Sequence, residues 1–213
     1  MPTVVYLVRH GVTDWNVAHR LAGRLAGISL NPDGRREAAA VASRLAALPI
    51  RMVASSPLER AQETAELIAR RHGLAVATEV AFLERGYAAW QGLPAAEIRE
   101  RFRDGVEAVS RGARVPGVES VEEMAERMWA GMERLAALHA DETVVIVSHA
   151  DPIRALIARV VGAPPARLRA ITIDTASLSR IRRRDTGAVV DYTNSRIHLD
   201  ALDTPGQPPS IPA

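Results

Sequence analysis

Near its start the chain reads Thr3-Val4-Val5-Tyr6-Leu7-Val8-Arg9-His10-Gly11. A run of β-branched and apolar residues without alternation is typical of a strand covered on both faces, as in the parallel sheet of an α/β protein. Ligands of such sheets bind beyond the carboxyl ends of the strands. We therefore expect a functional site at the end of this strand, where Arg9, His10 and Gly11 follow one another.

The same tripeptide occurs a second time, as Arg71-His72-Gly73, in a different context. It follows the amphipathic stretch 58–69, and cationic residues followed by a glycine are typical of the end of a helix. The sequence therefore predicts a structural role for His72. Only the preceding buried strand sets His10 apart from it.

Further periodic stretches predict an α/β domain with a mostly parallel sheet. We expect one domain over residues 1–201 and a loose, proline-containing tail over 202–213. Beyond the first strand, strands are expected at 50–55, 74–78, 143–148, 170–174, 177–183 and 188–193. Helices are expected at 32–48, 58–72 and 94–102, after a Ser120–Glu123 capping box, and after an Asp151 N-cap, whereas 104–118 is expected to be a loop.

Composition excludes several classes of partner. All 27 basic residues are arginines, but 25 acidic residues leave a net charge of only +2, and aromatic residues make up 4%. Such a chain offers neither a basic surface nor a stacking platform for nucleic acid. The absence of cysteine excludes disulfides and cysteine-ligated zinc, and no signal peptide or membrane-length apolar run is visible. We expect a cytoplasmic protein without membrane or nucleic-acid partners.

The side chains that follow three of the predicted strands share one chemistry. Arg9 and His10 follow the first strand, Arg60 follows the second, and His149 follows the strand at 143–148. The carboxyl ends of parallel strands share one edge of a sheet, so these side chains should converge. The planar guanidinium of arginine suits phosphate oxygens, and a neutral imidazole can attack phosphorus as a covalent nucleophile. The sequence therefore predicts a site for a phosphoryl group.

With these residues the chain resembles the histidine phosphatase superfamily, in the branch of cofactor-dependent phosphoglycerate mutases and related phosphatases. The resemblance implies a three-layer α/β/α fold around a mostly parallel sheet, as in the phosphoglycerate mutases. It rests on ordered motifs across residues 4–160: Leu7-Val8-Arg9-His10-Gly11 with Thr13 and Asn16, Ser55–Ala65 (SSPLERAQETA), Phe82-Leu83-Glu84 with Trp90-Gln91-Gly92, Pro116–Ser120 (PGVES) and Val147–Leu156 (VSHADPIRAL).

The resemblance also implies roles for individual residues. His10 would become a phosphohistidine while two arginines and His149 stabilise the phosphoryl oxygens. Glu84 would be the general acid, protonated at working pH, and would later deprotonate the attacking water. The residues expected to bind substrate are Arg9, Asn16, Gly23, Arg60, His149 and Ala150. The expected partner is a small phosphorylated substrate, without metal or other cofactor, and a homodimer through edge strands would be in keeping with the family.

The identity of the general acid leaves alternatives open. Ala88 and Gln91 stand where the family usually has a glycine and an acid, which makes Glu84 the least secure catalytic assignment. Glu79 is a second candidate. Asp151 is a third, although helix capping accounts for it as well.

Three functions are compatible with these motifs. The leading interpretation is a phosphatase acting on a small phosphorylated metabolite. The nearest alternative is a cofactor-dependent phosphoglycerate mutase, but the stretch 93–118 is short where the mutases carry a longer basic insertion, which favours hydrolysis. An inactive relative that binds phosphorylated ligands would have no need of a nucleophile such as His10.

Overall fold

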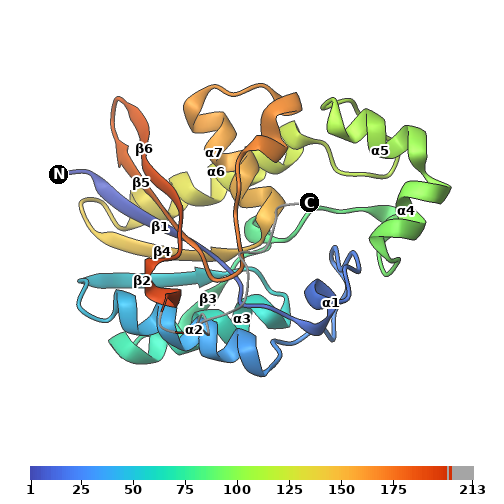
Figure 1. Ribbon diagram of the computed structural model, residues 1–213. Helices are drawn as coiled ribbons and strands as arrows, with labels where there is room; N and C mark the ends of the chain where they lie inside the picture. Colours follow the sequence, from blue (N-terminus) through green and yellow to red (C-terminus); the bar gives the residue numbers. More distant parts are fainter. Residues whose placement is uncertain (201, 203–213) are drawn as a thin grey trace.

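The computed structural model describes residues 1–200 and 202, and its centre is a six-stranded sheet (Figure 1). The strands are β1 (Thr3–Arg9), β2 (Ile50–Ser55), β3 (Val76–Thr78), β4 (Thr143–Ser148), β5 (Leu178–Arg184) and β6 (Gly187–Ser195). Their order is β3-β2-β4-β1-β5-β6. The first four in that order are parallel, whereas β5 and β6 are antiparallel to their neighbours. The predicted mostly parallel sheet is confirmed.

Helices cover both faces of this sheet and give the molecule three layers (Figure 1). The helices α2 (Pro32–Leu45) and α3 (Glu59–His72) pack on one face, and α6 (Val121–Leu138) and α7 (Ala150–Val161) pack on the other. The remaining helical segments are α1 (Asp14–Val17), α4 (Ala95–Arg101), α5 (Arg103–Ser110), η1 (Val80–Phe82), η2 (Ala88–Trp90), η3 (Pro165–Ala170) and η4 (Ile197–Leu199).

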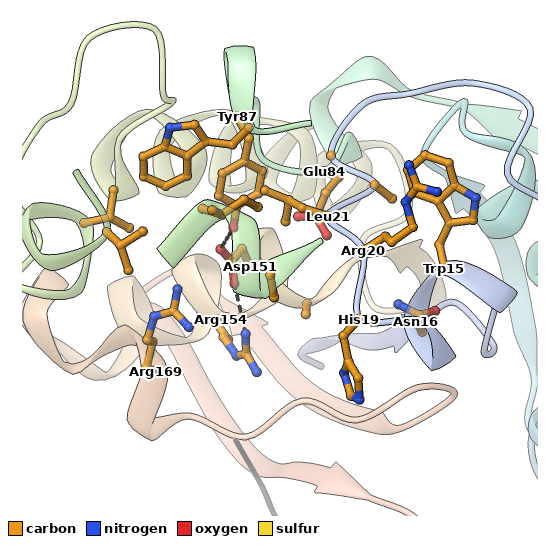
Figure 2. Close-up of a pocket in the computed structure, with 18 of the residues that line it drawn as sticks. Trp15, Asn16, His19, Arg20, Leu21, Glu84, Tyr87, Asp151, Arg154 and Arg169 are labelled. Atoms are coloured by element: carbon orange, nitrogen blue, oxygen red, sulfur yellow. Dashed lines mark hydrogen bonds and ion pairs between the residues drawn. The ribbon is translucent and has the colours of Figure 1, made fainter. Parts of the chain in front are cut away.

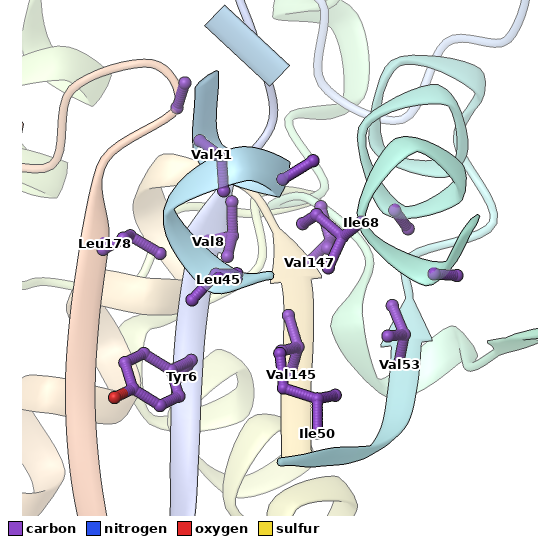
Figure 3. Packing of buried hydrophobic residues seen from close by; sticks show 14 of the residues in the cluster. Tyr6, Val8, Val41, Leu45, Ile50, Val53, Ile68, Val145, Val147 and Leu178 are labelled. Atoms are coloured by element: carbon purple, nitrogen blue, oxygen red, sulfur yellow. The ribbon is translucent and has the colours of Figure 1, made fainter. Parts of the chain in front are cut away.

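The apolar run of β1 is buried on both sides, as its composition predicts. Tyr6 and Val8 pack towards α2 and α3 (Figure 3), whereas Val5 and Leu7 pack in the core shared with α6 and α7. None of the four is more than 8% exposed. A strand enclosed in this way is held rigidly, which fixes the position of the residues at its carboxyl end.

Several helix ends have the chemistry that the sequence predicts. Asn31 caps α2 through its side chain, and Ser120 and Glu123 form a reciprocal capping box at the start of α6. Gly73 and Gly162 end α3 and α7 with left-handed φ angles of 65° and 69°, which a glycine adopts without steric cost. His72 therefore lies in an ordinary last helical turn, as predicted.

The prediction of a loop at 104–118 is wrong for its first part, where α5 forms. Gly105 was a loop signal in the sequence, but in the structure it allows α5 to approach Trp90, because a Cβ at this position would lie 2.9 Å from the indole ring. Val109 of the same helix is buried in a small cluster with that ring. Tertiary packing thus overrides the low helix propensity of the glycine.

The predicted strand at 170–174 is also wrong. This segment follows η3 and pairs with no strand in the described part of the chain. Ile173 is 1% exposed and contributes to the core, while its carbonyl accepts a hydrogen bond from Arg9. Burial produced the apolar pattern that resembled a strand.

The two remaining expectations concern membranes and the tail. No helix in the described residues combines the length and the apolar character needed to cross a bilayer. The predicted tail, 202–213, lies outside the described residues except for Leu202.

Candidate active site

Two histidines meet at the carboxyl ends of β1 and β4. Arg9 lies opposite Ser148 in the parallel ladder, and the amide of His10 donates to the Ser148 carbonyl at 3.0 Å. The two strands therefore deliver their next residues to the same place. The rings of His10 and His149 pack edge to face, with centroids 5.0 Å apart, and both side chains are buried.

A single hydrogen bond fixes the tautomer of His10. Its Nδ1 lies 2.7 Å from the Gly11 carbonyl oxygen, which can only accept, so Nδ1 carries the proton and Nε2 keeps its lone pair. Burial, followed by the charges of Arg60 and Arg9, lowers the pKa of His10 well below its ordinary value. The imidazole is therefore neutral at pH 7. A neutral ring with a free Nε2 is the nucleophilic form.

One terminal nitrogen of each arginine in the site donates a hydrogen bond to a backbone carbonyl. Arg9 donates from Nη1 to the Ile173 carbonyl at 2.8 Å, and Arg60 donates from Nη2 to the Gly23 carbonyl, also at 2.8 Å. Gly23 has a φ of +51°, and a Cβ there would collide with the side chain of Gln91. This position therefore requires glycine, and the loop carbonyl that anchors Arg60 is held in place.

Three buried nitrogen atoms of the site have no hydrogen-bond partner in the described part of the chain. Arg9 Nε, Arg60 Nη1 and His149 Nδ1 are buried, and none has a hydrogen-bond partner among the described residues. A buried donor without a partner costs about 1–3 kcal/mol, and more when it is charged. Arg60 and Arg9 both act on the pKa of His149 as well as that of His10, and both line one pocket with His10. The arrangement suits an anion.

A pocket of about 650 Å³ opens above this cluster. Its lining includes nearly every residue predicted to act in catalysis or binding, namely Arg9, His10, Asn16, Gly23, Arg60, Glu84 and Ala150. His149 is the exception, because it is completely buried against the ring of His10 and does not line the pocket.

Glu84 lies on the pocket wall and is partly buried (Figure 2). Its Oε1 accepts a hydrogen bond from the amide of Arg85 at 2.8 Å. Burial first and the charge of Asp151 second raise the pKa of Glu84 to about 7. Near neutral pH this carboxyl group can therefore both donate and accept a proton.

The segment around Glu84 is held by Glu119, from the motif before α6. The Glu119 carboxylate accepts two hydrogen bonds from Arg127 and forms an ion pair with Arg24. Both arginines also donate hydrogen bonds to the Glu84 carbonyl. The amide of Glu119 donates to Gly86 at 2.8 Å. The motif 116–120 thus fixes the backbone that carries Glu84.

Comparison with known proteins agrees with this geometry. The profile of the histidine phosphatase superfamily (branch 1) matches residues 5–196. The chain belongs to this superfamily.

Similar histidine phosphatase relatives carry different descriptions. PhoE of Bacillus subtilis, described as an uncharacterized phosphatase, is 31% identical over 94% of this chain and 98% of its own length. GpmB of Yersinia pestis, described as a probable phosphoglycerate mutase, is 32% identical over 93% of this chain and 97% of its own length. The structure of a mycobacterial glucosyl-3-phosphoglycerate phosphatase in complex with VO3 has a TM-score of 0.82 and 30% identity, covering 91% of this chain and all (100%) of that chain.

The capping role predicted for Asp151 is wrong in this histidine phosphatase. The N-cap of α7 is His149, and the Asp151 carboxylate instead accepts hydrogen bonds from Tyr87 and from Arg154, the latter at 2.9 Å (Figure 2). Arg85 lies 3.6 Å away. Burial alone would raise the pKa of Asp151, but Arg154, Tyr87 and Arg85 hold it below its ordinary value. Asp151 is therefore ionised, which does not suit a general acid.

Glu79, the other alternative acid, lies away from the pocket. Its carboxylate pairs with Arg134 of α6, and it is absent from the pocket lining. Asp151 also lines the pocket, but its pKa is lowered, so of the three candidate carboxylates only Glu84 combines a place on the pocket wall with a raised pKa.

Several supporting residues were not predicted from the sequence. Ser56 Oγ lies 2.8 Å from His149 Nε2, and Thr64 Oγ1 accepts from the amide of Gly11 at 3.2 Å. Both belong to the motif 55–65, which was noted only for its arginine. Tyr87 gave no signal at all, because a lone tyrosine in an irregular segment does not reveal which carboxylate it contacts.

Proposed function

We propose that this histidine phosphatase hydrolyses a small phosphorylated metabolite through a phosphohistidine on His10. One observation carries the proposal: a neutral His10 with a free Nε2 shares the pocket with Arg9 and Arg60, each of which has a buried guanidinium nitrogen without a partner in the part of the chain that the structure describes. A nucleophile set among anion-binding donors suits attack on a phosphoryl group.

The first step transfers the phosphoryl group to the protein. The Nε2 lone pair of His10 forms a bond to phosphorus while the bond between phosphorus and the ester oxygen breaks. Glu84, protonated in part at pH 7, gives its proton to the departing oxygen, which leaves as an alcohol. Arg9 and Arg60 stabilise the charge on the equatorial oxygens throughout.

The second step returns the protein to its starting state. The Glu84 carboxylate takes a proton from a water molecule as the water oxygen bonds to phosphorus. The bond between phosphorus and Nε2 breaks, inorganic phosphate leaves, and Glu84 is again protonated. A pKa of about 7 suits a group that acts first as acid and then as base.

A phosphoglycerate mutase is the second candidate, because GpmB is among the similar proteins. The two functions share the first step and differ in the fate of the phosphohistidine. In a mutase the phosphoryl group returns to a substrate oxygen instead of passing to water. We favour hydrolysis because the stretch 93–118 forms only two short helices and a connecting segment above the pocket.

The proposal is tested by a screen of phosphomonoesters with released phosphate as the readout, joined to a direct search for the intermediate. Brief incubation with a substrate, followed by an alkaline quench, should preserve an acid-labile phosphate on His10. His10→Ala should lose essentially all turnover while its circular dichroism stays unchanged, and His72→Ala, at the second Arg-His-Gly, serves as the matched control. Phosphate found on His72 or on a serine would refute the mechanism.

A further inference from the structure

The pocket extends well beyond the space that a phosphoryl group needs. Arg9, His10 and Arg60 form its inner end, and the whole volume is about 650 Å³. Sites that enclose entire small molecules typically measure about 300–1,000 Å³. If the proposed function holds, the remainder of the substrate therefore lies against the outer wall.

Part of the outer wall is apolar and rigid. The rings of Tyr87 and Trp90 stack with centroids 6.2 Å apart, and Ile98 of α4 and Val109 of α5 pack with them and line the pocket. None of these four side chains is more than 7% exposed. This surface suits the carbon skeleton of a substrate.

A different part of the wall is cationic. Arg154 of α7 donates to Asp151 and, through Nε, to the Ile171 carbonyl at 2.8 Å, which fixes its guanidinium. Arg169 of η3 lines the same pocket, and its side chain makes no hydrogen bond or ion pair with any described residue. Figure 2 shows both arginines on the same side of the pocket, next to Asp151.

The charges around Asp151 do not balance. Arg154 and Arg85 lie 2.9 Å and 3.6 Å from its carboxylate, and the charge of Arg169 acts on it too. Three guanidinium groups thus share one carboxylate. Among the described lining residues the only other carboxyl group is Glu84, which is half neutral at pH 7. Arg85 is buried, Arg154 is half-buried and Arg169 is exposed at the pocket edge. A further anion that reached Arg169 would offset the uncompensated positive charge next to Asp151.

We propose that the leaving group of the substrate carries a second anionic group, which Arg169 and Arg154 bind while the carbon skeleton packs on Tyr87 and Trp90. Arg169 supplies the free planar guanidinium, which suits a carboxylate or phosphate. Arg154 supplies a pre-oriented second charge. Phosphate esters whose leaving group is uncharged then lack the contacts with Arg169 and Arg154.

The test compares phosphate esters that differ in one charge. The longer pair is 4-(2-carboxyethyl)phenyl phosphate and its primary amide, in which two methylene groups insulate the phenol so that both leaving groups are chemically alike. The shorter pair is 3-phosphoglycerate and glycerol 3-phosphate. We expect kcat/KM to be about tenfold higher for the carboxylate of at least one pair, mainly through KM, as for a charge-assisted contact.

Two variants separate recognition from structure. Arg169→Gln should reduce the preference for the carboxylate over its neutral partner about fivefold or more, and Arg169→Lys should restore part of it. Arg167→Gln is the matched control, because Arg167 lies on the same η3, is exposed and does not line the pocket. It should keep the preference of the unmodified protein.

The outcomes distinguish the two proposals. If both members of each pair are hydrolysed with equal kcat/KM, the second-anion site is refuted while the phosphatase function stands. A preference for the carboxylate that survives in Arg169→Gln would likewise overturn the assignment of Arg169. No phosphate release from any of the four esters or from any member of the phosphomonoester screen would refute the phosphatase function, and this inference with it.

Discussion

At the scale of single residues, the site depends on two opposite displacements of pKa. Burial and two arginines hold His10 neutral, whereas burial and Asp151 hold Glu84 partly protonated. Both groups are thereby in the form that phosphoryl transfer requires at the same pH. When the surroundings of two neighbouring titratable groups move their pKa values in opposite directions, the two groups are candidates for different catalytic roles.

Replacing Glu84 by glutamine should separate the two steps of the reaction. With 4-nitrophenyl phosphate, whose phenolate leaves without needing a proton, Glu84→Gln should still phosphorylate His10. Hydrolysis of the phosphohistidine lacks its base and should slow by about 10²–10⁴-fold. Stopped-flow absorbance should therefore show a burst of about one nitrophenolate per protein molecule, followed by slow turnover.

The matched control for this experiment is Glu79→Gln. Glu79 was the alternative acid from the sequence, and it pairs with Arg134 outside the pocket. We expect rapid multiple turnover from this variant. A burst in Glu79→Gln and none in Glu84→Gln would move the role of the acid to Glu79.

The raised pKa of Glu84 also predicts how stability depends on pH. Its ordinary value is 4.5 and its value in the folded protein is about 7, so the folded state binds the proton more tightly than the unfolded state. The stabilisation is complete below pH 4.5 and is lost as pH rises through 7. Glu84→Gln removes the buried charge, and urea titrations should find it relatively more stable than the unmodified protein at pH 8 than at pH 5, by on the order of 2 kcal/mol. An equal difference at both pH values would contradict the assignment.

The sequence allowed prediction of those site residues that directly follow a strand. Arg9 and His10 follow an apolar run that is typical of a buried strand, so their place at the end of a strand could be predicted. Asp151 was misread, because a carboxylate near the start of a helix has an ordinary explanation in capping. Its real partners, Tyr87 and Arg154, include one residue 64 positions away along the chain. Such contacts exist only after folding.

At the scale of elements, β1 and α5 show why one prediction succeeded and another failed. Residues 4–8 are apolar because the sheet is covered on both faces, so composition alone indicates the strand. The helix α5 instead depends on Trp90, which packs on Val109 and against the bare backbone of Gly105. A glycine that allows close packing and a glycine that breaks a helix look the same in a sequence.

A methyl group at Gly105 should therefore alter the pocket wall. In Gly105→Ala the new Cβ would lie 2.9 Å from the Trp90 ring, so the ring or α5 must move. Helix propensity gains about 1 kcal/mol and offsets part of the strain, which makes stability a poor readout. We expect KM for large phosphate esters to change severalfold, while Arg103→Ala, an exposed substitution in the same helix, should leave KM unaltered. Identical KM values for the two variants would show that the contact does not shape the pocket.

At the scale of the whole molecule, the fold places chemistry and recognition on different elements. The parallel strands β1 and β4 end at His10, the proposed nucleophile, and at His149, while α4, α5, α7 and η3 supply the outer wall. This division explains why the reaction class follows from strand-end motifs and the substrate does not. The outer wall is assembled from short segments whose positions depend on long-range packing.

The fate of the phosphohistidine is the property of the whole molecule that separates a phosphatase from a mutase. A mutase must keep water away while its intermediate reorients, which requires a lid that closes over the substrate. In the segment 93–118, Arg101 and Arg111 pair with carboxylates of α4 and α5, whereas Arg99 lines the pocket. The segment therefore contributes one cation to the pocket wall.

We still expect hydrolysis to prevail, because Glu84 stands on the pocket wall with a pKa of about 7 and can deprotonate water as soon as the leaving group departs. The protein should be given 3-phosphoglycerate with a trace of bisphosphoglycerate, while isomerised product and free phosphate are measured together. Phosphate release should exceed isomerisation. If isomerisation were instead about a hundredfold faster, the barrier to return of the phosphoryl group would lie roughly 2.7 kcal/mol below the barrier to hydrolysis. The outer wall would then exclude water well enough for a mutase.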